Sequence, residues 1–274
     1  MPEMLLFVDR KSESLRLENA ILNRQSLMIC GPAGIGKTTL VTRVIAGLPA
    51  GLAGRCLEVR GAKDLRDLLQ QLILRLYEAK DPNLRRELHS LGVSALSLAA
   101  WLKKLSSSRM KGILYCALER GDCRVFLDHL PPVTKTVAKV VKELFWMRNT
   151  PVFLCIRDDA EQRIDRLSRF FYWGDGERLT LQPLPSDAAA KLLQACVARF
   201  QLPTLDLADF QADALDLSRN VPGAIVKMCA LAADPRYRCG SRIKTKSVYL
   251  DYLVDGYHHR TARAISGDNL SRQH

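Results

Sequence analysis

Residues 30–41, CGPAGIGKTTLV, contain a glycine, four further residues and then Gly-Lys-Thr at 36–38. This is the spacing of a phosphate-binding loop, in which glycines let backbone N–H groups approach phosphate oxygens and the following helix points its positive end at them. The loop follows an apolar run at 26–31 and precedes a helix predicted over about 37–47. The sequence therefore predicts a site for a nucleoside triphosphate.

Three side chains of the loop have specific expected roles. Lys37 would reach the β- and γ-phosphates, the Thr38 hydroxyl would bind Mg²⁺, and Thr39 would contact the α-phosphate region. The residues expected to surround the phosphates are Gly31, Pro32, Ala33, Gly34, Ile35, Gly36, Lys37, Thr38 and Thr39.

A second element of the site is predicted in VFLDHL, residues 125–130. Asp128 ends an apolar run, as expected of a strand-end carboxylate that holds the metal; the alternative is an aspartate that caps the next turn. His129 stands where many ATPases carry the glutamate that orients the attacking water. A neutral histidine can also accept a hydrogen bond from water. Histidine is less well placed than glutamate, so slow hydrolysis is expected, unless His129 is simply a polar residue at a strand end.

Arginines are predicted near the γ-phosphate. Arg157 ends the apolar run at 151–157, where its charge would report whether the γ-phosphate is present; pairing with an aspartate at 158–159 is the alternative. Arg166 or Arg169 could reach a neighbouring subunit as an arginine finger, and Arg169 is included among the expected catalytic residues. A solvent-facing or carboxylate-paired arginine is the alternative for both.

The fold class follows from the alternation of apolar runs with helical patterns. Such alternation predicts an α/β core whose parallel sheet is covered on both faces. The predicted strands are 26–31, 55–60, 123–130, 151–157 and 177–184.

Beyond Pro185 the pattern is helical only, which predicts an all-helical lid subdomain after the core. We expect a P-loop core over 1–184, the lid over 185–256 and a polar, disordered tail over 257–274. The helices expected in the lid are 186–200, 206–218, 222–233 and 245–255, with a loop at 234–242.

Charge and composition indicate the partners. The formal net charge is +12, which favours polyanions, and the basic segments 236–246 and 258–263 could contact duplex DNA; solvated loops are the alternative. There is no run of about 18 apolar residues and no signal-peptide pattern, so we expect a cytoplasmic protein without membrane contact. Eight cysteines without C-x-x-C spacing are expected to be reduced thiols.

Three further segments resemble the P-loop ATPases of the AAA+/STAND group. LLFVDRKSESLRLENAI (5–21) resembles their N-terminal box, in which Val8 and Arg10 would lie near adenine, although Asp9 replaces the usual glycine. LTLQPLPSDAAAKLL (179–193) resembles the join between the core and the lid.

The third segment, SRNVPGAIVKMCALA (218–232), resembles the lid motif whose proline packs on adenine. Pro222 matches that proline, and Asn220 stands where glycine is commonest. Arg157 resembles the strand-four arginine of STAND proteins, whose second acid after Asp128 is often missing. The resemblance implies the strand order of the ASCE class, a preference for ATP or ADP, and Mg²⁺.

The resemblance also implies a function. We expect a nucleotide-dependent switch with slow ATP hydrolysis that assembles on DNA or recruits a protein, like transposition helpers and initiators, either with a protein partner or as a homo-oligomer. The alternative is a STAND-type signalling or defence switch that binds a protein through the helices of 62–119 without DNA. A small-molecule P-loop kinase fits less well, because the helical subdomain and Arg157 are wrong for one.

Overall fold

The computed structural model describes residues 7–94, 97–130, 133–157, 177–202 and 206–254. The chain divides into two compact units. The sheet unit contains residues 11–32 and 40–181, and the lid unit contains residues 1–10, 33–39 and 182–274. Most of the phosphate loop therefore belongs to the same unit as the C-terminal helices.

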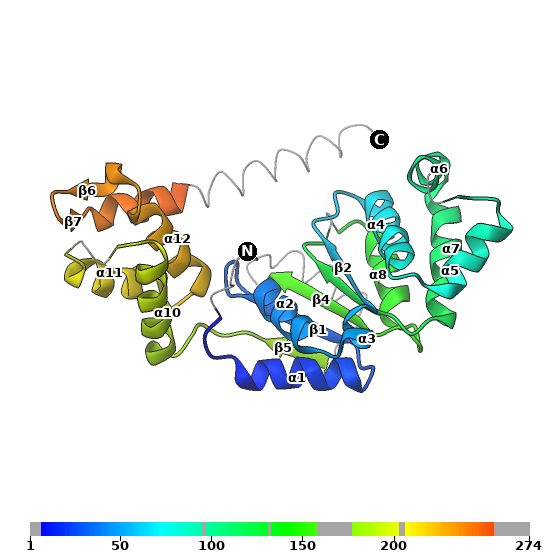
Figure 1. Cartoon of the computed structure of the whole chain (residues 1–274), viewed down its shortest axis with the longest axis horizontal. Coiled ribbons are helices and arrows are strands. Elements are labelled where there is room, and N and C mark those ends of the chain that lie inside the picture. Colours follow the sequence, from blue (N-terminus) through cyan, green and yellow to red (C-terminus); the bar gives the residue numbers. More distant parts are fainter. Residues whose placement is uncertain (1–6, 95–96, 131–132, 158–176, 203–205, 255–274) are drawn as a thin grey trace. The chain divides into compact units, whose positions relative to one another are not determined.

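A parallel sheet forms the centre of the sheet unit, with the spatial order β2-β3-β4-β1-β5 (Figure 1). This order, with the loop-bearing strand between two later strands, confirms the predicted fold class. Its middle strands are almost wholly buried, because helices cover both faces of a parallel sheet. The strands are β1 (Leu27–Gly31), β2 (Cys56–Arg60), β3 (Arg124–Asp128), β4 (Val152–Arg157) and β5 (Arg178–Thr180).

Strand β5 is shorter than the apolar pattern of 177–184 predicts. Its pairing with β1 continues only as far as the hydrogen bond from the Leu181 N–H to the Cys30 carbonyl, at 2.9 Å. Pro183 follows, and a proline has no N–H with which to extend a ladder. The last pairing of the sheet thus falls at Leu181, and the chain belongs to the lid unit from the next residue on.

The helices of the sheet unit have clear start signals. The side chains of Asp64, Asp81, Ser106 and Thr134 each accept a hydrogen bond from a backbone N–H in the first turn of a helix. Helices α4, α5 and α7 lie side by side (Figure 1). The helices are α1 (Lys11–Leu22), α2 (Lys37–Gly47), α3 (Ala50–Ala53), α4 (Leu65–Glu78), α5 (Pro82–Ser90), α6 (Leu98–Lys104), α7 (Ser107–Arg120) and α8 (Lys135–Phe145).

Successive side chains of a strand point to opposite faces of the sheet, so each strand contributes to the core on both faces. On one face, Val125 and Leu127 of β3 join a single apolar cluster with residues of α4, α7 and α8. Phe126 is not part of that cluster and stacks on Phe153 of β4, with ring centroids 4.4 Å apart. The long helical insertion between β2 and β3 is thus part of the core.

The lid unit is mainly helical. Its core gathers residues from all the lid helices, including Leu192, Phe210 and Met228. The described helices are α10 (Ser186–Arg199), α11 (Ala208–Ser218), α12 (Pro222–Ala232) and the helical residues 245–254.

The segment 234–242, which the sequence predicts to be a loop, has more structure than expected. It contains the 3-10 turn η2 (Pro235–Tyr237) and strand β6 (Arg238–Cys239), which pairs antiparallel with β7 (Arg242–Ile243). Strands of two residues carry no readable alternation, so the sequence pattern could not predict this hairpin.

Two global expectations concern membranes and cysteines. Within the described parts of the chain, no helix combines the length and the apolar character needed to cross a bilayer. All eight cysteines lie in the described residues; none forms a disulfide, and five of them are buried.

Candidate functional site

The phosphate loop joins the end of β1 to the start of α2. Strand β1 ends at Gly31 and α2 begins at Lys37, so the loop stands between a buried strand and a helix N-terminus. Gly34 has a φ of 77°, in the left-handed region where a side chain would be strained. A Cβ built on Gly36 would have no heavy atom within 4 Å. This open turn ahead of a helix N-terminus is an arrangement that binds phosphate in proteins.

The lid helix α12 contacts the phosphate loop directly. The backbone N–H of Gly223, in the first turn of α12, donates a hydrogen bond to the Gly34 carbonyl at 2.8 Å. A Cβ at position 223 would lie 2.8 Å from both the Cα and the carbonyl oxygen of Gly34. Only glycine permits this approach. Sequence reasoning did not single out Gly223; the Pro-Gly pair that opens a predicted helix was the signal available.

Arg10 connects the same loop to the chain that enters the lid. The residue is buried, and its guanidinium donates to the Ile35 carbonyl at 3.5 Å and to the Gln182 carbonyl. The resemblance predicts that Arg10 lies near adenine, and in the structure its guanidinium is hydrogen-bonded to protein backbone. Arg10 therefore helps to hold the backbone of the loop.

Two departures from the family pattern lie at positions that need left-handed backbone. Asp9 and Asn220 replace glycines that are usual in the resemblance, and their φ angles are 62° and 56°. Asn and Asp adopt this conformation more readily than other non-glycine residues. Both residues are thus of types that suit the backbone conformation found at these positions.

Predicted residues meet at the carboxyl edge of the sheet. Asp128 is the last residue of β3 and lies opposite Cys155 of β4. Arg157, the last residue of β4, lies opposite Gly31, where the phosphate loop starts. Parallel strands bring their carboxyl ends to one edge, which is where α/β sheets bind ligands.

His129 turns back onto Asp128. Its φ is 57°, and its Nδ1 lies 3.0 Å from Oδ1 of the Asp128 carboxylate. The Asp128 side chain is 11% exposed and the imidazole is 38% exposed. An ionised carboxylate can only accept, so a neutral imidazole in this position would direct its Nδ1–H to Asp128 and keep its lone pair on Nε2. Asp128 and His129, which the sequence predicts at the end of a strand, thus lie side by side at the end of β3.

No family model and no curated protein matches the chain. Solved structures do resemble it, among them two ATPases. A Walker-type ATPase of Pyrococcus abyssi has a TM-score of 0.60 at 17% identity over 94% of this chain and 76% of its own. A signal transduction ATPase with numerous domains (STAND), carrying a tetratricopeptide repeat sensor, from Pyrococcus horikoshii has a TM-score of 0.53 at 18% identity, over 91% of this chain and 33% of its own. The fold is that of a P-loop ATPase of the AAA+/STAND group.

The sequence identities to these two ATPases are low, so the likeness shows a shared fold and nothing further. The chain spans a third of the STAND protein's length.

The remaining loop residues lie as follows in this P-loop ATPase fold. Lys37, which is 9% exposed, and Ile35, which is 1% exposed, are buried, whereas Ala33 is exposed. Pro32, Thr38 and Thr39 are half-buried.

The residues expected near adenine belong to the lid unit. Val8 packs against the lid's apolar core, and Pro222 is the first residue of α12, directly before Gly223. Arg166 and Arg169 lie outside the described residues, as does the basic segment 258–263.

The residues present fit a nucleotide with Mg²⁺. The expected donors to the metal are the Thr38 hydroxyl and the Asp128 carboxylate, which are hard oxygen ligands of the kind Mg²⁺ prefers. The space beside Gly36 is open, because no heavy atom lies within 4 Å of the place where its Cβ would stand.

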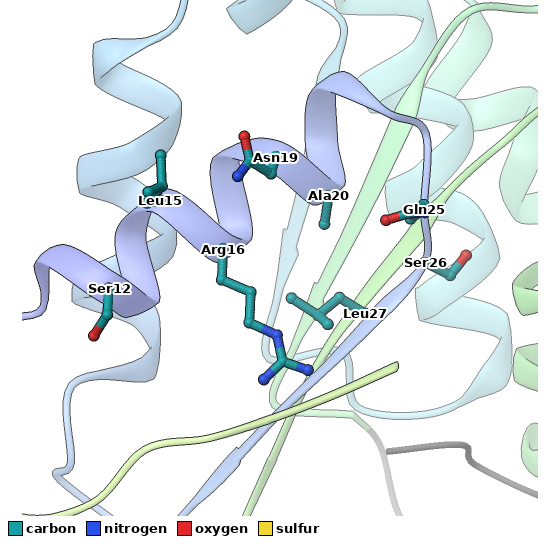
Figure 2. Close-up of a pocket in the computed structure, with 8 residues that line it drawn as sticks. All are labelled: Ser12, Leu15, Arg16, Asn19, Ala20, Gln25, Ser26 and Leu27. Carbon is teal, nitrogen blue, oxygen red and sulfur yellow. The ribbon is translucent and has the colours of Figure 1, made fainter. Parts of the chain in front are cut away.

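A hollow of about 320 Å³ lies elsewhere in the sheet unit, along α1. Figure 2 shows Arg16 reaching from α1 past Leu27, and its guanidinium donates to the Arg178 carbonyl of β5 at 2.7 Å. No residue of the phosphate loop lines this hollow, so it is separate from the candidate nucleotide site. The lining residues are Ser12, Leu15, Arg16, Asn19, Ala20, Gln25, Ser26 and Leu27.

Proposed function

We propose that the chain binds ATP or ADP with Mg²⁺ at the phosphate loop and acts as a nucleotide-dependent switch. The observation that carries this proposal is the hydrogen bond from Gly223 to Gly34, because it joins the lid helix to the backbone that would surround the phosphates. A ligand that shifts the loop must then alter the start of α12. A bound nucleotide can therefore change the conformation of the lid.

The expected roles of the polar residues follow from their positions. Lys37 binds the β- and γ-phosphates, and Thr38 and Asp128 hold the metal. When bound, Mg²⁺ neutralises phosphate charge. Arg157, at the end of β4, contacts the γ-phosphate and so distinguishes ATP from ADP.

We propose that ATP hydrolysis is slow. The Nδ1 of His129 lies 3.0 Å from the Asp128 carboxylate, so Nε2 is the ring atom that would accept a proton from water. Imidazole is a weaker partner for this task than the usual glutamate, because it has one acceptor atom in place of two. Slow hydrolysis gives the ATP-bound state a long lifetime, which suits a switch.

The output of the switch is proposed to be assembly on DNA or recruitment of a protein, in the manner of transposition helpers and initiators. Support comes from the net charge of +12 and from the basic segment 236–246, which includes the β6–β7 hairpin. A homo-oligomer in which Arg169 acts on a neighbour's nucleotide belongs to the same proposal. The alternative is a STAND-type signalling or defence switch whose partner docks on helices α4 to α7.

The test is the steady-state rate of ATP hydrolysis with and without duplex DNA at two salt concentrations, with Lys37→Ala as the blank. Salt-sensitive stimulation by DNA supports the DNA-associated switch, because phosphate contacts weaken steeply with salt. A slow rate that DNA does not change supports the protein-partner alternative. A rate that Lys37→Ala leaves intact contradicts the proposed site.

A further inference from the structure

Helix α8 carries a row of lysines and a tryptophan on its exposed side. Lys135, Lys139 and Lys142 are exposed, and Trp146, the residue directly after α8, is 56% exposed. Steps of four, three and four residues place all of them on one face of the helix. The opposite face of α8 is buried in the core of the sheet unit. These four residues are called the α8 stripe.

The lysines of the α8 stripe form no ion pair in the described part of the chain. The acid near them is Glu143, whose pKa burial would raise and Lys139 helps to lower below its ordinary value. The one acid of α8, Glu143, accepts instead from the Lys111 ammonium and the Tyr115 hydroxyl, each at 2.8 Å. The stripe thus presents three positive charges in a row to solvent.

An open hollow of about 650 Å³ adjoins the tryptophan end of the stripe, between the ends of α7 and α8. Trp146, Tyr115, Arg120 and Arg148 contribute to its lining, together with two glutamates. Its volume falls within the range of pockets that hold small organic ligands. Aromatic rings and guanidinium planes are the surfaces on which nucleobases stack.

We propose that the α8 stripe binds single-stranded nucleic acid. The backbone phosphates lie along Lys135, Lys139 and Lys142, and one base stacks on Trp146 in the hollow. Lysines supply the phosphate contacts and an aromatic ring supplies a base platform that tolerates any sequence. An acidic peptide would use the lysines but would gain less from the ring, and in a duplex the bases are already stacked on one another. This inference rests on the proposed function in one respect: it assumes that the nucleotide-dependent switch acts on a polyanion.

The first test measures the anisotropy of a fluorescein-labelled oligothymidylate. Changing Lys135, Lys139 and Lys142 together to Gln should weaken binding at least about tenfold and reduce the slope of log K against log salt by about 2, since each phosphate contact on a single strand contributes about 0.7. The matched control changes three other exposed lysines, Lys63, Lys103 and Lys104, to Gln and should weaken binding less than about twofold. Equal losses in the two triple variants, or no binding by the wild type, would overturn the proposal.

The second test separates nucleic acid from an acidic protein. Trp146→Ala should weaken oligothymidylate binding roughly fivefold or more, because base stacking on an aromatic ring contributes that much. Unlabelled poly-glutamate should compete poorly. Effective competition by poly-glutamate together with an unchanged affinity in Trp146→Ala would identify an acidic protein surface as the ligand and overturn the proposal.

A third measurement, of ATP binding by the same proteins, distinguishes failure of the nucleotide switch from failure of nucleic-acid binding by the α8 stripe. The α8 variants should bind ATP as the wild type does, because none of the changed residues belongs to the phosphate loop. Intact ATP binding without oligothymidylate binding refutes this inference alone. Oligothymidylate binding without ATP binding refutes the proposed nucleotide switch alone.

Discussion

The backbone N–H of Gly223 donates a hydrogen bond of 2.8 Å to the carbonyl of Gly34, which joins the first turn of the lid helix α12 to the phosphate loop. The two backbones approach so closely that position 223 has no room for a Cβ. A loop that rearranges around phosphates therefore cannot leave the lid helix unaffected. This contact gives the proposed switch its physical basis.

Gly223→Ala tests the contact. The added methyl group would overlap the Gly34 backbone, so one of the two segments must move. We expect a loss of about 1–3 kcal/mol in the free energy of unfolding, measured by denaturant titration, and weaker ATP binding.

The matched control is Gly112→Ala in α7. A Cβ at 112 would meet no atom within 4 Å, and alanine favours a helix interior, so this variant should be more stable by about 0.5–1 kcal/mol. A Gly223→Ala protein as stable as the wild type, with unchanged ATP affinity, would show that the contact does not matter.

Asn220 tests the left-handed backbone at the entrance to α12. Its φ of 56° is tolerated by asparagine and disfavoured for β-branched residues. We expect Asn220→Val to cost about 1–2 kcal/mol in the free energy of unfolding and Asn220→Gly to cost little or nothing. Thermal and denaturant unfolding of the two variants measure this difference. Equal stability of the Val and Gly variants would contradict the assigned backbone conformation.

Asp122 gives the protein a predictable response to acid. Its burial would raise the pKa of the carboxyl, but Arg124, Arg24 and Arg55 outweigh burial and lower the pKa below its ordinary value. A lowered folded-state pKa adds stability above the unfolded-state pKa, near 3.9, and that stability is lost as the pH falls through the folded-state value.

Asp122→Asn should therefore reduce the free energy of unfolding at neutral pH, and its difference from the wild type should shrink below about pH 4. Denaturant titrations over this pH range provide the measurement. Asp213→Asn, which removes an exposed carboxylate from α11, is the control. A difference that stays constant from neutral to acid pH would refute the role assigned to the arginines.

His129 tests the proposed slow turnover. If it is only a weak acceptor for the attacking water, His129→Ala should lower the steady-state rate of ATP hydrolysis by less than about tenfold, whereas an effective general base contributes about 100-fold or more. Asp128→Asn should abolish the Mg²⁺-dependent rate. Fast wild-type turnover that His129→Ala abolishes would make the histidine the water-positioning group and contradict this account.

Much of the fold was predictable because its signals are local. The apolar face of α8 and the continuous apolar run of β4 appear directly in the sequence, and the structure has both elements. The phosphate loop was equally clear, because its chemistry requires closely spaced glycines between a strand and a helix. Local periodicity could therefore predict the α/β class and the strand end at Asp128.

The relationships that join distant segments were not predictable. The approach of Gly223 to Gly34 and the bonds of Arg10 to the backbone depend on how the lid packs, which one sequence does not encode in any short pattern. The side chain of His129 lies beside Asp128 on a left-handed backbone; histidine adopts that conformation more often than most residues, but a single residue type does not predict it.

The most direct measurement of the switch is backbone hydrogen exchange in α12 with and without Mg²⁺-ATP, in the wild type and in Lys37→Ala. We predict that Mg²⁺-ATP changes exchange in the first turn of α12, at and after Gly223, and that Lys37→Ala removes the change. If ATP binds the wild type and protects the phosphate loop while exchange in α12 stays the same, the loop and the lid are not coupled and the chain is not the proposed switch.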